Sequence, residues 1–235
     1  MKMLAMKVPQ MFNTISERYD FINTVLSLGL DRYWRKAVCQ HLPSKQRIKL
    51  LDCATGTGDQ LISLIKNCPA IYDAVGIDPA QEMLTIASKK LRRYSYCLQL
   101  ACAPAEKIPY PDHMFDAVTI SFGIRNVENL SQSLEEIYRS LAPQGRLIIL
   151  EFSHPQNKLI RFLHRFYLNQ VVPYVGKWLS KNKEAYTYLS NTIETFPQGE
   201  ALCSILRQAG FENVTIKPLT LGIVSLYIGE KRCIV

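Results

Sequence analysis

Short apolar runs alternate with amphipathic segments of helical spacing along most of this chain. Strands are predicted over residues 47–54, 73–78, 95–102, 115–122 and 145–153, and helices over residues 57–68, 79–93, 130–141 and 199–211. Two final strands are predicted over residues 211–219 and 223–231. Because strands and helices follow one another in turn, the pattern favours an α/β fold with a parallel sheet and helices on both faces.

Length and composition set the class of protein. With 235 residues, 48% of them hydrophobic and 20% charged, the chain is predicted to form one globular domain over residues 1–235. Its seven cysteines include no C-x-x-C pair, so we expect reduced thiols in a cytoplasmic protein and no metal site. No apolar run reaches the roughly 18 residues of a membrane span.

The net charge of +8 is concentrated in two segments. Residues 1–49 hold nine Lys or Arg against three Asp or Glu, and residues 155–195 hold six against two. The remainder is slightly acidic. Clustering by chance is one explanation, and an anionic partner such as a membrane surface or nucleic acid is the other.

The first predicted strand ends in the turn "DCATGTG", residues 52–58. Glycines at a strand end allow a tight turn or a close approach of the backbone to a ligand, and ligands of open α/β sheets bind at this edge. A dinucleotide fingerprint would need a third glycine where Leu61 stands. A phosphate loop would need Lys and Ser or Thr where Asp59 and Gln60 stand. Phosphate is therefore not the ligand that we expect at this turn.

The same turn resembles motif I, D-x-G-x-G-x-G, of class I S-adenosylmethionine (SAM) methyltransferases, with Ala54 in place of the first glycine. The resemblance implies that SAM is the cofactor, that S-adenosylhomocysteine is its product, and that Asp52, Gly56, Thr57 and Gly58 belong to the cofactor loop.

Asp78 lies at the carboxyl end of the second predicted strand, twenty residues beyond Gly58. An acidic side chain in this place can accept hydrogen bonds from both ribose hydroxyls of a nucleoside, which is the interpretation we favour. The alternative is a helix cap, with Pro79 as first helical residue and Gln81 completing a capping box. Two interpretations of Asp59 stay open: it contacts the cofactor, or it is an acidic residue of the kind favoured in the first turn of a helix.

Four further stretches resemble one methyltransferase family: "ERYDFIN", "GLDRYWRK", "TISFGIRNV" and "LEFSHP". They are similar to the quinone-biosynthesis C-methyltransferases, which include demethylmenaquinone methyltransferase and 2-methoxy-6-polyprenyl-1,4-benzoquinol methylase, and the similarity runs from about Phe12 to Lys231. The resemblance implies a Rossmann-like class I fold with a mostly parallel seven-stranded sheet. It also implies an N-terminal helical cap over residues 1–46 and a helical lid over residues 155–195.

The family resemblance implies transfer of the SAM methyl group to a ring carbon of a reduced polyprenyl quinone precursor, with demethylmenaquinol as the preferred substrate and a benzoquinol as the alternative. It places Thr57, Asp78 and Ser121 against SAM, and Pro104 and Ala105 along the adenine. At the first of these two adenine positions the family commonly has Asn or Asp. Proline offers neither a side-chain acceptor nor an N–H, so adenine recognition should depend on the Ala105 amide and on shape.

Methylation of carbon requires an electron-rich ring, so the acceptor should be the hydroquinone, and a cation beside the developing phenolate would lower the barrier. Arg125 and Asn126 follow the fourth predicted strand and are candidates for this role, and Tyr19 could cover the ring. Arginine seldom acts as a base, so we favour electrostatic stabilisation by Arg125. The alternatives are an ordinary surface arginine at position 125 and a helix-start pair at Tyr19 and Asp20.

Two alternatives lie outside quinone chemistry. Base-amino methyltransferases usually have an Asn/Asp-Pro-Pro-aromatic turn after the fourth strand, where this chain has "SFGIRN", so we expect no nucleic-acid partner. This argument applies to base-amino methylation, and methylation of RNA at another position stays open as an alternative. A second alternative is that the protein binds SAM without catalysing a reaction. Whether it forms a homodimer also stays open.

The stretch "NKLIRFLHRFYL" at the start of the predicted lid has helical spacing, which separates a basic face from an apolar one. The basic face holds Lys158, Arg161 and Arg165, and the apolar face holds Leu159, Phe162, Leu163 and Phe166. Such a helix suits the surface of the inner (cytoplasmic) membrane next to a lipid-soluble substrate. An intramolecular lid, with its apolar face packed on the domain, is the equal alternative.

Overall fold

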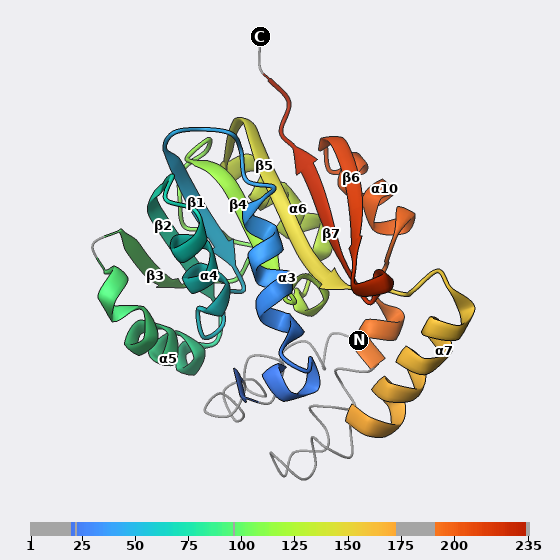
Figure 1. Cartoon of the computed structure of the whole chain (residues 1–235). Helices are drawn as coiled ribbons and strands as arrows, with labels where there is room; N and C mark the ends of the chain where they lie inside the picture. The colour runs from blue at the N-terminus through green and yellow to red at the C-terminus, as the bar shows by residue number, and fades with distance from the viewer. Residues whose placement is uncertain (1–19, 22, 96, 173–190, 234–235) are drawn as a thin grey trace.

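The computed structural model describes residues 20–233, apart from residues 22, 96 and 173–190. Seven strands form one sheet in the order β3-β2-β1-β4-β5-β7-β6 (Figure 1). The strands are β1 (Ile48–Cys53), β2 (Ile71–Asp78), β3 (Leu98–Cys102), β4 (Phe115–Ser121), β5 (Leu141–Phe152), β6 (Glu212–Leu219) and β7 (Val224–Glu230). All seven predicted strands are present.

The sheet is parallel except at β7, which pairs antiparallel with β5 on one side and with β6 on the other. The chain runs outward through β1, β2 and β3 and then returns to place β4 on the other side of β1. The carboxyl ends of β1 and β4 therefore form the point where the strand order reverses, which is where open α/β sheets bind ligands. The prediction of a mostly parallel, seven-stranded Rossmann-like sheet is confirmed.

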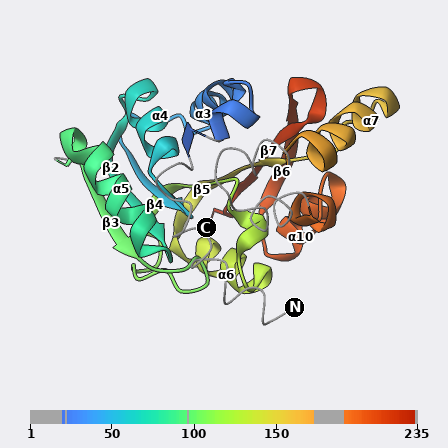
Figure 2. The same cartoon turned by 90° about the horizontal axis from the view of Figure 1, so that it is seen from below.

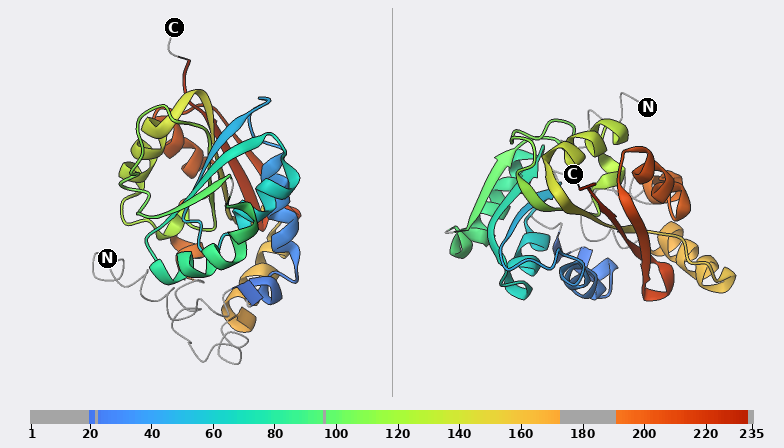
Figure 3. Two further views of the ribbon diagram at one scale, coloured as in Figure 1. Left: turned by 90° about the vertical axis from the view of Figure 1, so that its left-hand side faces the viewer. Right: turned by 90° about the horizontal axis from the view of Figure 1, so that it is seen from above.

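Helices cover both faces of the sheet (Figures 2 and 3). The helices are α3 (Leu30–Cys39), α4 (Asp59–Asn67), α5 (Gln81–Leu91), α6 (Leu130–Ser140), α7 (Lys158–Phe166) and α10 (Glu200–Gln208). One hydrophobic cluster packs α3, α4 and α5 on one face, and a second packs α6 and α10 on the other. The left-handed Gly210, with φ of 94°, lies just past the end of α10, as the sequence predicts.

Helix α5 begins later than predicted. Pro79 is not its first residue, because the helix starts at Gln81 and Ala80 is its N-cap. The Oδ1 atom of Asp78 accepts a hydrogen bond from the Ala80 N–H at 2.8 Å, which holds residues 79 and 80 in an extended link outside the helix. The capping box predicted as the alternative role of Asp78 is therefore wrong.

The described part of the 155–195 segment is helical from Lys158 onward. Asn157 caps α7 by accepting hydrogen bonds from the N–H groups of Leu159 and Ile160, and a π-helical turn, Tyr167–Val171, follows. Within the described ranges, no helix has both the length and the apolar character needed to cross a membrane.

Candidate active site

The glycine turn after β1 uses left-handed backbone conformations at three positions. Gly56 and Gly58 have φ values of 55° and 84°, and Ala54, which replaces the first glycine of the motif, has a φ of 50°. Gly58 also permits close packing, since a Cβ atom there would lie 2.6 Å from Cδ1 of Leu91 in α5. The glycines thus serve both the sharp turn and the close approach of α5 to that turn.

A cavity of about 500 Å³ lies beside this turn at the carboxyl edge of the sheet. It brings together residues that follow β1, β2, β3 and β4. Six of the predicted site residues line it: Gly56, Asp78, Pro104, Ala105, Ser121 and Asn126. Its volume suits a nucleoside-sized ligand.

Asp78 holds the wall of this cavity together. Its Oδ2 atom accepts a hydrogen bond from the Gly56 N–H at 2.8 Å, while Oδ1 accepts from Ala80 as described. Burial raises the pKa of the Asp78 carboxyl, and the two backbone N–H groups oppose that rise. Each carboxylate oxygen has a second lone pair, so the side chain can still accept from two ribose hydroxyls.

Asp52 lies behind the turn and does not line the cavity. Its two oxygens accept hydrogen bonds from the hydroxyls of Thr55, at 2.7 Å, and of Thr119, at 2.6 Å. It therefore joins β1 to the turn and to β4. Asp52, which was predicted as a cofactor residue, therefore supports the turn from behind.

Thr57 and Gly58 also lie outside the cavity lining. The Thr57 hydroxyl donates to Asp20 at 2.5 Å and accepts from Lys90 of α5 at 3.2 Å. Lys90 also pairs with Asp20, at 2.7 Å, and with Asp59. This cluster anchors Asp20 to the glycine turn. Asp59 is thus an ion-paired acid in the first turn of α4 and not part of the cavity.

Pro104, Ala105 and Glu106, which follow β3, form another part of the cavity wall. The Glu106 carboxylate accepts hydrogen bonds from the N–H groups of Glu128, at 2.6 Å, and Asn129, at 3.2 Å, just before α6. This carboxylate therefore supports the cavity wall, and the sequence analysis did not identify it.

The turn after β4 also contributes to the cavity wall. Ser121 donates a hydrogen bond to Gln60 at 3.1 Å, and Asn126 belongs to the short 3-10 turn Ile124–Asn126, labelled η2. Gly123 in this turn has no room for a side chain, because a Cβ atom would lie 2.5 Å from that of Ala54. The ends of β1 and β4 thus meet at close range. Tyr19, the third predicted catalytic residue, lies outside the described residues.

Arg125 is not a surface arginine, so that alternative is wrong. Its side chain is only 4% exposed, and Nη1 lies 2.5 Å from Oε1 of Glu151, which is itself 2% exposed. The guanidinium carbon lies 5.5 Å from the centre of the Phe152 ring. Burial raises the pKa of Glu151, and Arg125 opposes the rise. The sequence analysis missed Glu151, although it stands within the "LEFSHP" stretch.

An aromatic cluster of Trp34, Phe122 and Phe152 packs beside this ion pair. The Phe122 and Phe152 rings are 4.9 Å apart, and Trp34 lies 6.1 Å and 6.3 Å from them. Phe122 lines the cavity and has a φ of 57°, a strained conformation for a bulky residue. The strand end is therefore bent toward the site, at a cost in backbone energy.

We expect Asp52 to make the stability of the protein depend on pH. Burial raises the pKa of its carboxyl from 3.8 to about 6 in the folded protein. The folded protein therefore binds this proton more tightly than the unfolded chain, and the resulting stabilisation is present below about pH 4 and lost as the pH rises through 6. The free energy of unfolding that is lost over this pH range is about 2 to 3 kcal/mol.

Urea unfolding of the Asp52→Asn variant between pH 4 and 6.5 tests this expectation. An amide keeps polar contact with both threonine hydroxyls but does not titrate, so the free energy of unfolding should fall less steeply with pH than in the wild type. Parallel profiles of the two proteins would show that Asp52 does not titrate in this range.

Comparisons with known proteins agree with this arrangement. Residues 1–231 match the sequence model of the ubiE/COQ5 methyltransferase family. The chain is 41% identical over 227 residues to a "Ubiquinone/menaquinone biosynthesis C-methyltransferase UbiE" of Geotalea daltonii, covering 96% of each chain. It is 40% identical to a "Demethylmenaquinone methyltransferase" of Deinococcus radiodurans, covering 96% of this chain and 92% of the relative.

Solved structures support the fold. A SAM-dependent methyltransferase from Thermotoga maritima, described as a possible histamine N-methyltransferase, superposes with a TM-score of 0.64 at 19% identity, covering 95% of this chain and 99% of that one. A SAM-dependent methyltransferase from Aquifex aeolicus gives a TM-score of 0.61 at 18% identity, covering 83% and 88% of the two chains. The chain has the class I fold, binds SAM as its cofactor, and belongs to the ubiE/COQ5 methyltransferase family.

Proposed function

We propose that this protein transfers the methyl group of SAM to a ring carbon of demethylmenaquinol, a reduced polyprenyl quinone precursor, to form menaquinol. The observation that carries the proposal is the similarity of nearly the whole chain to enzymes named for this reaction, at about 40% identity. The ubiquinone-pathway benzoquinol is the second candidate, because the name of the Geotalea relative includes both quinones.

The residues at the carboxyl edge suit this chemistry. SAM, when bound, supplies an electrophilic methyl group on a sulfonium centre. Asp78 would hold the ribose, and Gly56 lets the backbone approach the cofactor closely. On the acceptor side, the guanidinium of Arg125 would stabilise negative charge on the quinol oxygen, while the phenolic proton leaves to water.

Incubation with SAM and a reduced acceptor tests the proposal. Mass spectrometry should detect a product one methyl group heavier with demethylmenaquinol, and none with the oxidised quinone, whose ring is too electron-poor to attack the methyl group. A benzoquinol acceptor in a parallel reaction separates the two candidates. If neither quinol is methylated while SAM binds, the proposed substrate class is wrong.

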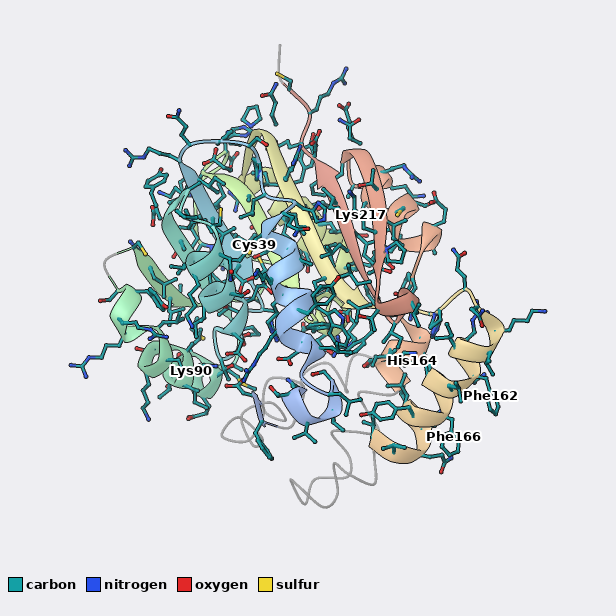
Figure 4. All side chains as sticks on the ribbon, in the orientation of Figure 1. Cys39, Lys90, Phe162, His164, Phe166 and Lys217 are labelled. Carbon is teal, nitrogen blue, oxygen red and sulfur yellow. The ribbon has the colours of Figure 1, made fainter. Side chains whose placement is uncertain are left out.

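We further propose that α7 binds the surface of the inner membrane and brings the protein to its lipid-soluble substrate. Four apolar side chains of this helix are 56% to 67% exposed: Leu159, Phe162, Leu163 and Phe166. His164 is buried on the opposite side (Figure 4). The alternative, in which the apolar face packs on the domain, disagrees with this exposure. A basic face beside exposed apolar residues is typical of interfacial helices.

Sedimentation with vesicles of anionic lipid tests this membrane contact. The wild type should bind at low salt and less at high salt, because screening weakens the attraction of Arg161, Arg165 and Lys158 to the lipid headgroups. The double variant Phe162→Ser, Phe166→Ser should bind at least about tenfold more weakly, at ~0.8 kcal/mol per apolar carbon withdrawn from lipid. Tyr72→Ser, at an exposed aromatic residue near the start of β2, is the matched control. Equal binding of all three proteins would contradict the proposal.

A further inference from the structure

The ion pair between Arg125 and Glu151 is costly for the fold. Both side chains are almost completely buried, with exposures of 4% and 2%. Replacing such a pair with apolar side chains often leaves stability unchanged or improves it, so a buried pair is poor support for a purely stabilising role.

The pair is also incompletely hydrogen-bonded. The Nε atom of Arg125 and the Oε2 atom of Glu151 are both buried and have no hydrogen-bond partner within the described part of the chain. A buried polar atom without a partner costs about 1 to 3 kcal/mol. Because the buried pair lowers the stability of the fold, a functional role at the acceptor side of the site explains it better than a structural one.

The contacts of Glu151 connect two strand ends. Glu151 is the penultimate residue of β5, and its Oε1 atom accepts from Arg125 at 2.5 Å and from the Phe152 N–H at 2.8 Å. The backbone N–H of Arg125 also stabilises the Glu151 carboxylate. Through these bonds the end of β5 holds the η2 turn, whose next residue, Asn126, lines the cofactor cavity.

The neighbours of Arg125 leave the guanidinium few alternative positions. Phe152 lies against it on one side, and the aromatic cluster of Trp34, Phe122 and Phe152 fills the space toward α3. The carboxylate of Glu151 is the hydrogen-bond acceptor that fixes it within this apolar surrounding.

We propose that Glu151 is the positioning residue for Arg125: it holds the guanidinium beside the acceptor site and offsets its charge until the quinol oxygen becomes negative. This inference rests on the proposed function. In the ground state the pair is neutral overall and attracts a neutral quinol only weakly. As the phenolic proton leaves, the phenolate shares the guanidinium with Glu151, and a charge already fixed in place needs no reorganisation.

Two substitutions of Glu151 distinguish its role in holding the Arg125 guanidinium in place from its role in offsetting the charge of that group. Glu151→Ala removes the acceptor, so the guanidinium can move, and kcat should fall by up to about 100-fold with little change in the Kd of SAM. In Glu151→Gln the amide oxygen can still accept from Nη1 of Arg125 and from the Phe152 N–H, so most of kcat should return. Because the amide has no charge to offset the guanidinium, the acid limb of the kcat profile should move to lower pH.

A double-mutant comparison shows whether Glu151 acts through Arg125. When Arg125 is already alanine, Glu151→Ala should cause no further loss of kcat. Glu230→Ala is the matched control, because Glu230 pairs with Arg146 in the middle of β5, does not line the cavity, and its loss should leave kcat unchanged. Multiplicative losses at positions 125 and 151 would overturn the proposal. So would wild-type values of kcat and of the pH profile in both Glu151 variants.

A measurement without substrate keeps this inference separate from the proposed function. The Nε–H signal of Arg125 in ¹⁵N NMR spectra, identified by its absence in Arg125→Ala, should exchange slowly with water in the wild type. It should exchange at least about tenfold faster in Glu151→Ala, because the anchored side chain is released. An unchanged exchange rate would overturn the positioning role, whereas failure of the wild type to methylate any quinol would count against the proposed substrate alone.

Discussion

Replacing Arg125 with alanine should lower the turnover number by about 100-fold or more, the scale of removing one donor that stabilises an oxyanion, while the affinity for SAM changes little. Arg125 does not line the cofactor cavity, and its guanidinium is fixed by Glu151 and Phe152. The charge that it would stabilise is small in the bound quinol and grows only as the phenolic proton leaves. Its contribution is therefore concentrated in the transition state.

Stability has to be separated from catalysis in this variant. Removing the arginine leaves the Glu151 carboxylate buried without its cation, which costs about 3 to 5 kcal/mol unless the carboxyl takes up a proton. Single-turnover rates should therefore be measured at saturating quinol, on protein shown to be folded by calorimetry. The Kd of SAM should be measured on the same samples.

Arg125→Lys is the informative companion to the alanine variant. Lysine keeps the positive charge but loses the planar fork, so we expect an intermediate rate with a steeper dependence on pH. If Arg125→Ala turns over normally at saturating quinol, Arg125 has no catalytic role, which would then pass to Asn126, Tyr19 or ordered water.

Replacing Asp78 with alanine should weaken SAM binding by about 1.5 to 3 kcal/mol, which is roughly 10- to 150-fold in Kd. The carboxylate lies at the cavity wall and has free lone pairs for the ribose hydroxyls. It also accepts hydrogen bonds from Gly56 and Ala80, so its removal frees the cofactor turn as well. Both effects act on cofactor binding.

Isothermal titration with SAM and with S-adenosylhomocysteine measures this loss. Asp73→Ala is the matched control, because Asp73 lies on the same strand, near its other end, and pairs with Lys49. Its Kd should stay within about twofold of the wild type. A folded Asp78→Ala protein with unchanged SAM affinity would remove Asp78 from the cofactor site.

Local sequence determined the order and type of the elements. The apolar runs at 48–53 and 115–121 became buried neighbouring strands, because their side chains leave no exposed face. The glycine turn and Asp78 were both predictable, since each stands where a strand ends and the carboxyl ends of parallel strands share one edge. These regularities depend on spacing along the chain.

The start of α5 and the roles of motif residues depended on contacts that spacing does not reveal. Asp52 and Thr57 belong to the same short motif as Gly56, yet neither lines the cavity, and both are hydrogen-bonded to other side chains. Asp52 lies beside Thr119 because β1 pairs with β4, and Thr57 is engaged by Lys90, 33 residues further along.

The largest difference between the sequence-based expectation and the structure concerns Arg125. The sequence left open whether Arg125 is a surface residue or a catalytic one. Its partner Glu151 lies 26 residues away and comes beside it only when β4 and β5 pair in register, with Ser121 opposite Leu150. Amino-acid type and spacing determined that this chain would form an α/β sheet with a glycine turn after its first strand, and the resemblance of that turn to motif I implied SAM as the cofactor. Tertiary packing decided which charges are buried together, because the cost of removing a charge from water depends on every neighbour that surrounds it.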